Sequence, residues 1–428
     1  MGLTEISWNL LKFIMENTLF WIIIAIILFD FLFEKILDYL NIKNLKEKLP
    51  LELNDIYDGD KYKKSQQYER VTTKFSFITS LFSLILILLM LFDGGFTFLD
   101  EFVRGVSESI YLRTLMFFGI LGFTFDVISI PFQIYGTFVL EEKFGFNKTT
   151  IKTFAFDKLK SWAISILLGG GIISFILWAW LTMGSLFFPI VFAGLSLFMI
   201  FMAMFYSQLI VPLFNKLTPL EDGTLRGKIE KFANKTGFKL KNVFVIDGSK
   251  RSTKANAYFS GLGPKKMIVL YDTLINDLTE DEIVSVLAHE VGHYKKKHIY
   301  KGLAMSLLQS ALMLFILSVA LKYPELSMSI GAVDASFYMG IIAFGLLYSP
   351  LSFIIGIISN IFTRKYEYEA DNFACINSKA EDLVSALQKL SVNNLSNLTP
   401  NKLYVFFNYS HPTLLQRKDA MILQSDKG

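Results

Sequence analysis

The sequence "VLAHEVGHYKKKHIYKG", residues 286–302, runs directly into the apolar sequence "LAMSLLQSALMLFILSVAL", residues 303–321. In the first, two histidines stand four positions apart, a spacing that puts both imidazoles on one face of a helix. The second is long and apolar enough to cross the hydrocarbon core of a bilayer, which takes about 20 residues in a helix. The junction predicts a metal-binding helix at the edge of a membrane.

The residues around the histidines predict a helix with well-defined ends. Thr279 and Glu282 have the spacing of a capping box at its start. Acidic residues follow in the first turn, and Lys295, Lys296 and Lys297 lie in the last turn, as the helix dipole favours. We therefore expect the histidines to lie on a helix and not in a loop.

On this helix, His289 and His293 can hold one Zn²⁺ per chain. Glu290 follows the first histidine, where its carboxylate can reach a water molecule at the metal and act as general base. The pattern indicates a zinc-dependent hydrolase. The alternative is a solvent-exposed helix without a metal, on which two histidines have this spacing by chance.

A catalytic zinc takes three protein ligands, so a third is needed. The other two histidines, His298 and His411, are candidates, although His298 is more simply explained as a structural charge at the helix C-terminus. The acids of "TRKYEYEADNFA" are the stronger candidates. Glu367 is preferred there, and Asp371 one turn later can orient a ligand imidazole. Glu369 stays an alternative to Glu367, because spacing does not decide between them.

Composition indicates a membrane protein. The 428 residues are 53% hydrophobic and 19% charged, with a mean hydropathy of +0.44, which is too apolar for a soluble protein. Apolar runs of about 20 residues with charges at their ends predict transmembrane helices. Seven such runs lie near residues 14–37, 76–98, 114–138, 161–183, 187–214, 303–322 and 338–362. The fifth follows the fourth through a tight hairpin expected at "TMGSLFFP".

The chain is expected to divide into four parts. Residues 1–215 hold helices one to five, 216–302 the first part of a catalytic domain, 303–362 helices six and seven, and 363–428 the second part with the third ligand. In the first catalytic part, helical spacing in "LEDGTLRGKIEKFANKTG", a strand in "NVFVID" and a hairpin in "NAYFSGLGPKKMIVLYD" predict a small β-sheet. The predicted fold is mainly α: a polytopic membrane protein with a zincin-like catalytic domain that contains this sheet.

Lys and Arg gather in alternate loops and in the segment 216–302, which predicts an N-terminus outside the cell and a catalytic domain facing the cytosol. The first apolar run lacks a preceding basic stretch, so we interpret it as a retained span. The net charge of +4 follows from the basic loops and indicates no nucleic-acid partner. The single cysteine, Cys375, excludes an internal disulfide. The oligomeric state is left open.

The segments "HEVGH", "RKYEYEAD", "KRSTKANAYFSG", "VLYDTL", "GFNKTT" and "YSHPTLLQR" together resemble the type I CAAX prenyl proteases, over essentially the whole chain. The resemblance implies an integral membrane zinc endopeptidase that cuts near the C-terminus of lipidated peptides in contact with membrane lipid. It selects Glu367 as the third ligand. It also implies that Asn256 and His411 contact substrate beside the metal, and Arg417 of the same tail is assigned to the substrate site with them. Taken alone, Asn256 could be an ordinary turn residue and Arg417 a surface or salt-bridge residue.

Two alternatives stay open. One is a quality-control metalloprotease that acts on unprenylated membrane proteins with the same catalytic set. The other is a seven-helix receptor or transporter with a structural zinc. Frequent Ile, Lys, Phe and Asn favour a bacterial inner membrane over the endoplasmic reticulum. Asp126 and Gln133, within the third span, are expected either to bond between helices or to line a water-filled space.

Overall fold

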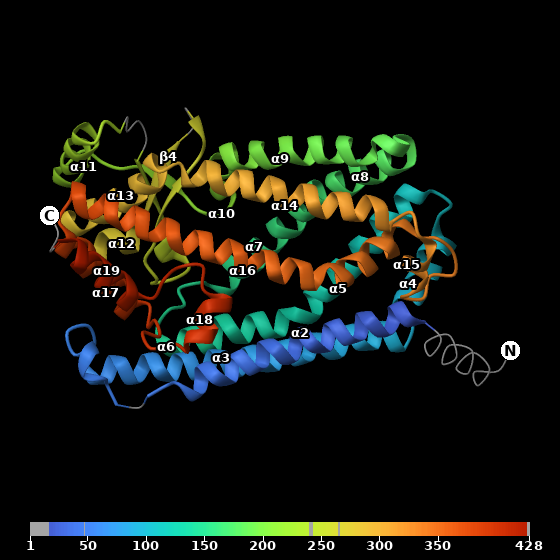
Figure 1. Cartoon of the computed structure of the whole chain (residues 1–428), viewed down its shortest axis with the longest axis horizontal. Helices are drawn as coiled ribbons and strands as arrows, with labels where there is room; N and C mark the ends of the chain where they lie inside the picture. Colours follow the sequence, from blue (N-terminus) through green and yellow to red (C-terminus); the bar gives the residue numbers. More distant parts are fainter. Residues whose placement is uncertain (1–16, 47, 239–242, 264–265, 426–428) are drawn as a thin grey trace.

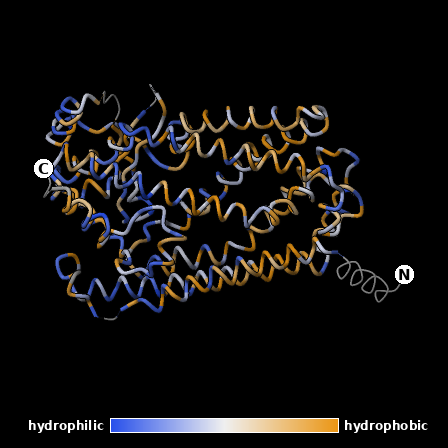
Figure 2. The backbone as a smooth tube through the Cα atoms, in the orientation of Figure 1, coloured by the Kyte–Doolittle hydropathy of each residue, from blue (hydrophilic) through white to orange (hydrophobic). Residues whose placement is uncertain are grey.

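The computed structural model describes residues 17–46, 48–238, 243–263 and 266–425. Long helices run along the long axis of the molecule, and the strands lie with several shorter helices at the end where the C-terminus is marked (Figure 1). Hydropathy divides the same way: apolar residues follow the long helices and polar residues cluster at the C-terminal end (Figure 2). The chain thus has an apolar helical part and a polar part.

The apolar part consists of helices joined by short turns. Its elements up to residue 214 are α2 (Thr18–Lys43), η1 (Leu51–Leu53), α3 (Gly59–Phe92), α4 (Gly95–Val106), α5 (Ile110–Tyr135), η2 (Gly136–Glu141), α6 (Glu142–Phe144), α7 (Ile151–Ile164), η3 (Ser165–Gly169), α8 (Gly170–Thr182), η4 (Gly184–Leu186), α9 (Phe187–Leu209) and α10 (Val211–Phe214). Later in the chain come α14 (His298–Ala320), α15 (Pro324–Met328) and α16 (Phe337–Asn377). The turn of η4 between α8 and α9 confirms the predicted hairpin.

Among the described residues, six helices are long and apolar enough to cross a membrane. They span Gly59–Phe92, Ile110–Phe144, Ile151–Thr182, Gly184–Phe214, His298–Ala320 and Phe337–Asn377, which matches six of the seven predicted runs. The first predicted run begins outside the described residues and continues in α2. Asp30, Glu34 and Lys35 interrupt the apolar character of α2, so its crossing of the membrane stays a prediction.

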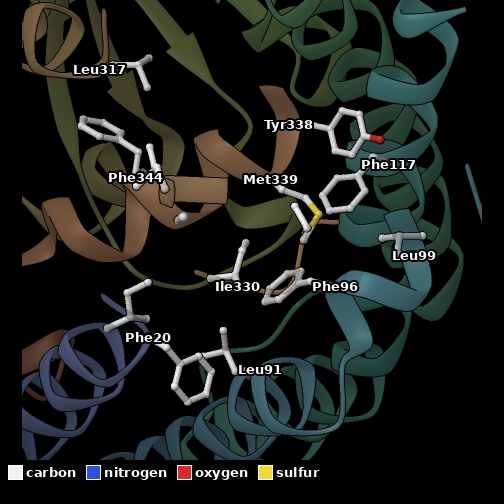
Figure 3. Close-up of a cluster of buried hydrophobic side chains, with 14 of the residues drawn as sticks. Phe20, Leu91, Phe96, Leu99, Phe117, Leu317, Ile330, Tyr338, Met339 and Phe344 are labelled. Atoms are coloured by element: carbon white, nitrogen blue, oxygen red, sulfur yellow. The ribbon is translucent and has the colours of Figure 1, made fainter. Parts of the chain in front are cut away.

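One buried apolar cluster holds the helices together at the end away from the polar part. Figure 3 shows aromatic and aliphatic side chains from α2, α4, α5, α14 and α16 meeting there. Phe20, Phe96, Phe117 and Met339 are at most 2% exposed. In the most apolar 18-residue part of each candidate span, only 6–11% of the residues are buried in the protein.

The polar part contains the predicted small sheet. Its elements are β1 (Leu217–Pro219), α11 (Thr224–Lys235), β2 (Val243–Ile246), η5 (Gly248–Lys250), β3 (Ala257–Ser260), β4 (Met267–Tyr271), α12 (Asp272–Asp277), α13 (Glu280–Lys295), α17 (Ala380–Asn393), α18 (Lys402–Asn408) and α19 (Leu414–Ser425). The strand order is β1-β2-β4-β3. β2 and β4 are parallel, while β1 and β3 pair antiparallel with their neighbours. The sheet is therefore mixed, and β3 is an edge strand.

Helix α13 lies at the centre of the polar part. Thr279 and Glu282 form the predicted capping box at its start. Its apolar side chains, among them Ile283, Leu287 and Val291, are buried in one cluster with residues of α11, β4, α16 and α17. The helix is thus fixed against the sheet on one side and against α16 on another, and this packing determines where its histidines lie.

Candidate metal centre

Two helices bring together three side chains that can hold a metal ion. His289 and His293 belong to α13, and Glu367 belongs to the polar end of α16. One ligand atom of each lies within 4.8 Å of the other two. His289 and Glu367 are buried and His293 is half-buried. Of the two glutamates weighed from the sequence, the structure places Glu367 with the histidines.

The separations between these atoms fit a tetrahedral zinc site. Nε2 of His293 lies 3.1 Å from Nε2 of His289 and 3.2 Å from Oε1 of Glu367. Nε2 of His289 lies 3.5 Å from Oε2 of Glu367. Zinc–ligand bonds of about 2.0–2.1 Å at tetrahedral angles put ligand atoms about 3.3 Å apart. Unprotonated donor atoms this close repel one another unless protons or a cation lie between them, and the distances and the two-imidazole, one-carboxylate donor set fit Zn²⁺.

Asp371 holds the other nitrogen of His289. Nδ1 of His289 lies 2.8 Å from Oδ1 of Asp371, and Arg417 donates hydrogen bonds of 2.6 and 2.8 Å to the same carboxylate. Burial lowers the pKa of His289, but hydrogen bonds to Asp371 and Glu367 outweigh burial and raise the pKa to about 9. The contact keeps the ring proton on Nδ1 and leaves Nε2 for the metal.

Glu290 lies on α13 beside the edge strand of the sheet. It is half-buried. Burial raises the pKa of Glu290, whereas His289, His293 and the backbone amide of Phe259 in β3 lower it, and the pKa stays above the ordinary value of a glutamate. A raised pKa suits a carboxylate that takes a proton from water and gives it up again near neutral pH.

The strand next to Glu290 has an open edge. Among the described residues, β3 pairs only with β4, and the amide of Tyr271 in β4 donates to the carbonyl of Asn256. In antiparallel pairing, Asn256 and every second residue after it then make the backbone hydrogen bonds to β4. Ala257 and Phe259 therefore turn their N–H and C=O groups to the open edge. Asn256 is exposed at the start of this strand, so an extended peptide that pairs with the edge would pass it.

The C-terminal segment brings His411 and Arg417 to the same carboxylate. Nε2 of His411 lies 3.4 Å from Oε1 of Glu367, and the His411 side chain is 60% exposed. The Arg417 side chain is 11% exposed and lies 3.6 Å from Oε2 of Glu367. Both residues line a cavity of about 350 Å³. His411 thus faces open space, whereas the bonds of Arg417 to Asp371 favour an orienting role over the substrate contact expected from the sequence.

His298 and Glu369 make contacts that the sequence did not predict. His298 was expected as a charge at the end of the metal-binding helix, but α13 ends at Lys295 and His298 begins α14. Its Nδ1 lies 3.0 Å from Nδ1 of His293, and its Nε2 lies 3.0 Å from Oε2 of Glu369. The sequence offered one signal of this contact, a third histidine shortly after His289 and His293. Its spacing did not predict which residues it would contact.

Asp126 and Gln133 form part of a contact between helices. Asp126 of α5 lies 2.7 Å from Nζ of Lys158 and 2.8 Å from Nε1 of Trp162, both in α7. The amide of Gln133 lies 3.3 Å from the same carboxylate. Gln133 also lines a cavity of about 500 Å³ between α3, α5 and α7. The expected interhelical hydrogen bond is thus found for Asp126, whereas Gln133 bonds within α5 and lines the cavity.

Comparisons with known proteins extend over most of the chain. Residues 38–216 match the family model "CAAX prenyl protease N-terminal, five membrane helices", and residues 219–421 match "Peptidase family M48". The chain is 34% identical to CAAX prenyl protease 1 of Saccharomyces cerevisiae, over 93% of this chain and 94% of that protein. It is 31% identical to the CAAX prenyl protease 1 homolog of Homo sapiens, over 87% and 88%. The crystal structure of S. mikatae Ste24p is similar with a TM-score of 0.89 and 34% identity, over 94% of this chain and 99% of that one.

Proposed function

The chain belongs to the CAAX prenyl protease family of M48 metallopeptidases, and on this premise we propose that it is a zinc-dependent membrane endopeptidase that cuts near the C-terminus of lipidated peptides. The observation that carries the zinc assignment is the convergence of His289, His293 and Glu367 at tetrahedral spacings. The lipid preference is supported by the names of the relatives and by the position of the site at the end of the apolar helices.

A peptide substrate would bind as an added strand on the open edge of β3. The carbonyl groups of Ala257 and Phe259 would accept main-chain hydrogen bonds from the peptide, which fix its register without demanding particular side chains. The Ala257 amide donates to Oδ1 of Asn256 at 2.8 Å, so a peptide would have to displace Asn256 to use that amide. Asn256, exposed at the start of β3, would contact the peptide backbone. Because the amide of Phe259 also interacts with Glu290, a peptide on this edge lies beside the general base.

Each residue of the site then has a role in hydrolysis. Bound zinc would supply a Lewis acid for the scissile carbonyl and would lower the pKa of a water molecule. Glu290 takes the proton from that water and delivers it to the leaving amine. His411, exposed beside Glu367, donates a hydrogen bond to the oxygen that becomes negative. Asp371 and Arg417 keep His289 in the required tautomer.

We further propose that the polar part faces the cytosol and the N-terminus lies outside, because Lys and Arg gather in the loops on the side of the polar part. The predicted bacterial inner membrane stays a prediction. The relatives reported above come from eukaryotes, which favours the endoplasmic reticulum for those proteins. A receptor or transporter with a structural zinc is excluded by the family.

The proposal is tested by mass spectrometry of products from matched peptides. One peptide carries a prenylated C-terminal CAAX-type sequence, a second is the same peptide without lipid, and a third is an unfolded membrane segment. We expect cleavage within the last residues of the prenylated peptide, loss of cleavage with a zinc chelator and recovery with added zinc. Equal cleavage of all three would favour quality control, and cleavage of none would refute the proposal.

A further inference from the structure

The second zinc-binding histidine has a support of its own, on the side away from Asp371. Nδ1 of His293 lies 3.0 Å from Nδ1 of His298, and Nε2 of His298 lies 3.0 Å from Oε2 of Glu369. His298 is 5% exposed. Three side chains from α13, α14 and α16 thus form one continuous line of hydrogen bonds that ends at the metal site.

Metal binding by Nε2 of His293 would decide which atom donates and which accepts in each of these hydrogen bonds. Nε2 of His293 points to the other ligand atoms, so its unshared electron pair is needed there and the ring proton lies on Nδ1. That N–H donates to Nδ1 of His298, which must then accept. The proton of His298 lies on Nε2 and donates to Glu369. Each ring therefore has one tautomer that satisfies every partner.

The backbone between the two helices makes the contact possible. In a continuous helix, residues five positions apart point about 140° away from each other, so His293 and His298 would not meet. Lys297 has a φ of +60°, a left-handed conformation that non-glycine residues seldom adopt. This single residue ends α13 and turns His298 back toward His293. The contacts of the two helices around it hold Lys297 in this strained conformation.

The ring of His298 is held in place on its other faces. It stacks on Tyr366 at a centroid distance of 4.4 Å with an interplanar angle of 14°. Nζ of Lys301 lies 3.8 Å from the carboxylate of Glu369 and 5.1 Å from the ring centre of Tyr366. The chain of hydrogen bonds is therefore embedded in a packed group that limits rotation of the imidazole.

We propose that His298, oriented by Glu369, is a positioning residue that fixes the tautomer and ring plane of His293 for metal binding. The two ligand histidines then have unlike supports. His289 donates to a carboxylate that Arg417 also binds, and His293 donates to a neutral imidazole. The inference rests on the proposed function only in taking zinc as the metal. Outer partners of metal ligands contribute about 10–100-fold to metal affinity.

Two variants of His298 test the proposal with opposite effects on packing and hydrogen bonding. His298→Phe keeps a ring to stack on Tyr366 but has no acceptor for His293. His298→Asn gives up the ring but places an amide oxygen near the position of Nδ1. For the full chain purified in detergent, zinc affinity is measured by competition with a chelator. We expect H298F to bind zinc about 10–100-fold more weakly and H298N to keep most of the affinity.

Two further readouts separate positioning from a general loss of structure. The absorption spectrum of the cobalt-loaded protein should change in H298F and stay close to wild type in H298N, and the KM for peptide should stay unchanged in both. Thermal unfolding of the metal-free proteins checks folding. If H298F does not fold, Glu369→Ala is measured instead, with weaker zinc binding as the expected result.

Wild-type zinc affinity in H298F, or in Glu369→Ala where H298F does not fold, would overturn the proposal. So would H298N that binds zinc as weakly as H298F, because ring packing would then matter and the acceptor would not. A wild-type protein that binds zinc but cleaves no peptide would refute the proposed function alone, since the affinity measurements do not depend on turnover.

Discussion

Gly292 of α13 lies against the backbone of Ala370 in α16. A Cβ atom at Gly292 would lie 3.0 Å from both the Cα and the carbonyl oxygen of Ala370, closer than such contacts ordinarily are. The two helices that carry the candidate metal ligands therefore cross so closely that a side chain at position 292 would force the backbone of Ala370 to shift. This glycine is the fourth residue of "HEVGH", so the motif provides both the ligands and the surface on which the third ligand's helix packs.

The first prediction follows from this crossing. Gly292→Ala should push α16 away from α13, because the obstacle is backbone and cannot rotate aside. Glu367 would then leave the position set by the histidines, and we expect zinc affinity to fall about tenfold or more. The measurement is chelator competition. Gly302→Ala, where nothing lies within 4 Å of an added Cβ, is the matched control, and an equal effect of both changes would contradict the prediction.

The second prediction concerns Glu290. Glu290→Gln keeps the shape of the side chain but cannot take a proton from water, so cleavage should slow about 10²–10⁴-fold. Zinc content should not change, because Glu290 is not among the three ligands. Peptide cleavage and metal analysis on the same preparation check both statements. Cleavage at the wild-type rate would remove Glu290 from the mechanism.

The third prediction concerns Asp371. Asp371→Asn removes the carboxylate that Arg417 binds at 2.6 and 2.8 Å, leaves Arg417 its longer 3.6 Å contact with Glu367, and weakens the hydrogen bond to His289. We expect about 10–100-fold weaker zinc binding and a lower thermal midpoint. Arg417→Lys should have a smaller effect, because lysine keeps the charge but not the paired hydrogen bonds. An Asn variant with wild-type zinc affinity would show that His289 needs no orienting carboxylate.

The fourth prediction concerns the start of α13. The Glu282 carboxylate accepts from the Thr279 amide at 2.8 Å, from Ser385 at 2.6 Å and from Lys389 at 2.7 Å. Glu282→Gln should destabilise the polar part by about 2 kcal/mol, because hydrogen bonds to a charged group are lost. Chemical denaturation followed by circular dichroism measures this change. Asp281→Asn, which alters an exposed ion pair with Lys228, is the control and should change stability little.

The same carboxylate gives a direction for acid stability. Burial raises the pKa of Glu282, but Lys389, Ser385 and the Thr279 amide outweigh burial, and the pKa lies below its ordinary value of 4.5. A lowered pKa stabilises the folded state above pH 4.5, and this contribution is lost as the pH falls further. Wild type should therefore lose stability in acid more steeply than E282Q. Parallel acid curves would contradict the prediction.

The fifth prediction links zinc binding to pH. The pKa of His289 is raised to about 9 in the metal-free protein, and zinc must displace that proton. Zinc affinity should therefore rise about tenfold per pH unit up to about pH 9. Stability of the metal-free protein should instead fall as the pH rises. Protonated His289 contributes fully to this stability below its ordinary pKa of 6.5, and the contribution is lost as the pH rises to about 9. Chelator competition and thermal unfolding from pH 6 to 9 test both. A flat affinity profile would contradict the prediction.

Much of the fold could be predicted from local patterns in the sequence. Apolar runs predicted six long helices, because the length and apolar composition that a bilayer crossing requires can be read directly from the sequence. The capping box of Thr279 and Glu282 marked the start of α13. The hairpin of β3 and β4 followed from alternation around glycines. The character of α2 as a span was not decided, since Asp30, Glu34 and Lys35 interrupt the apolar pattern.

The sequence by itself determined that His289, Glu290 and His293 share one helix and that the two histidines lie on the same face of it, because these features depend on spacing within one turn or two. The role of Glu290 as general base stays a prediction. Only the tertiary structure decided how distant residues meet this helix. His289 and Asp371 are 82 residues apart, and no periodicity connects them. The crossing of α13 and α16 at Gly292 places Glu367, and not Glu369, beside the two histidines. The left-handed turn at Lys297 brings His298 against His293. The packing of the C-terminal segment brings Arg417 to Asp371. Local spacing fixes the face of a helix, whereas packing fixes what that face meets.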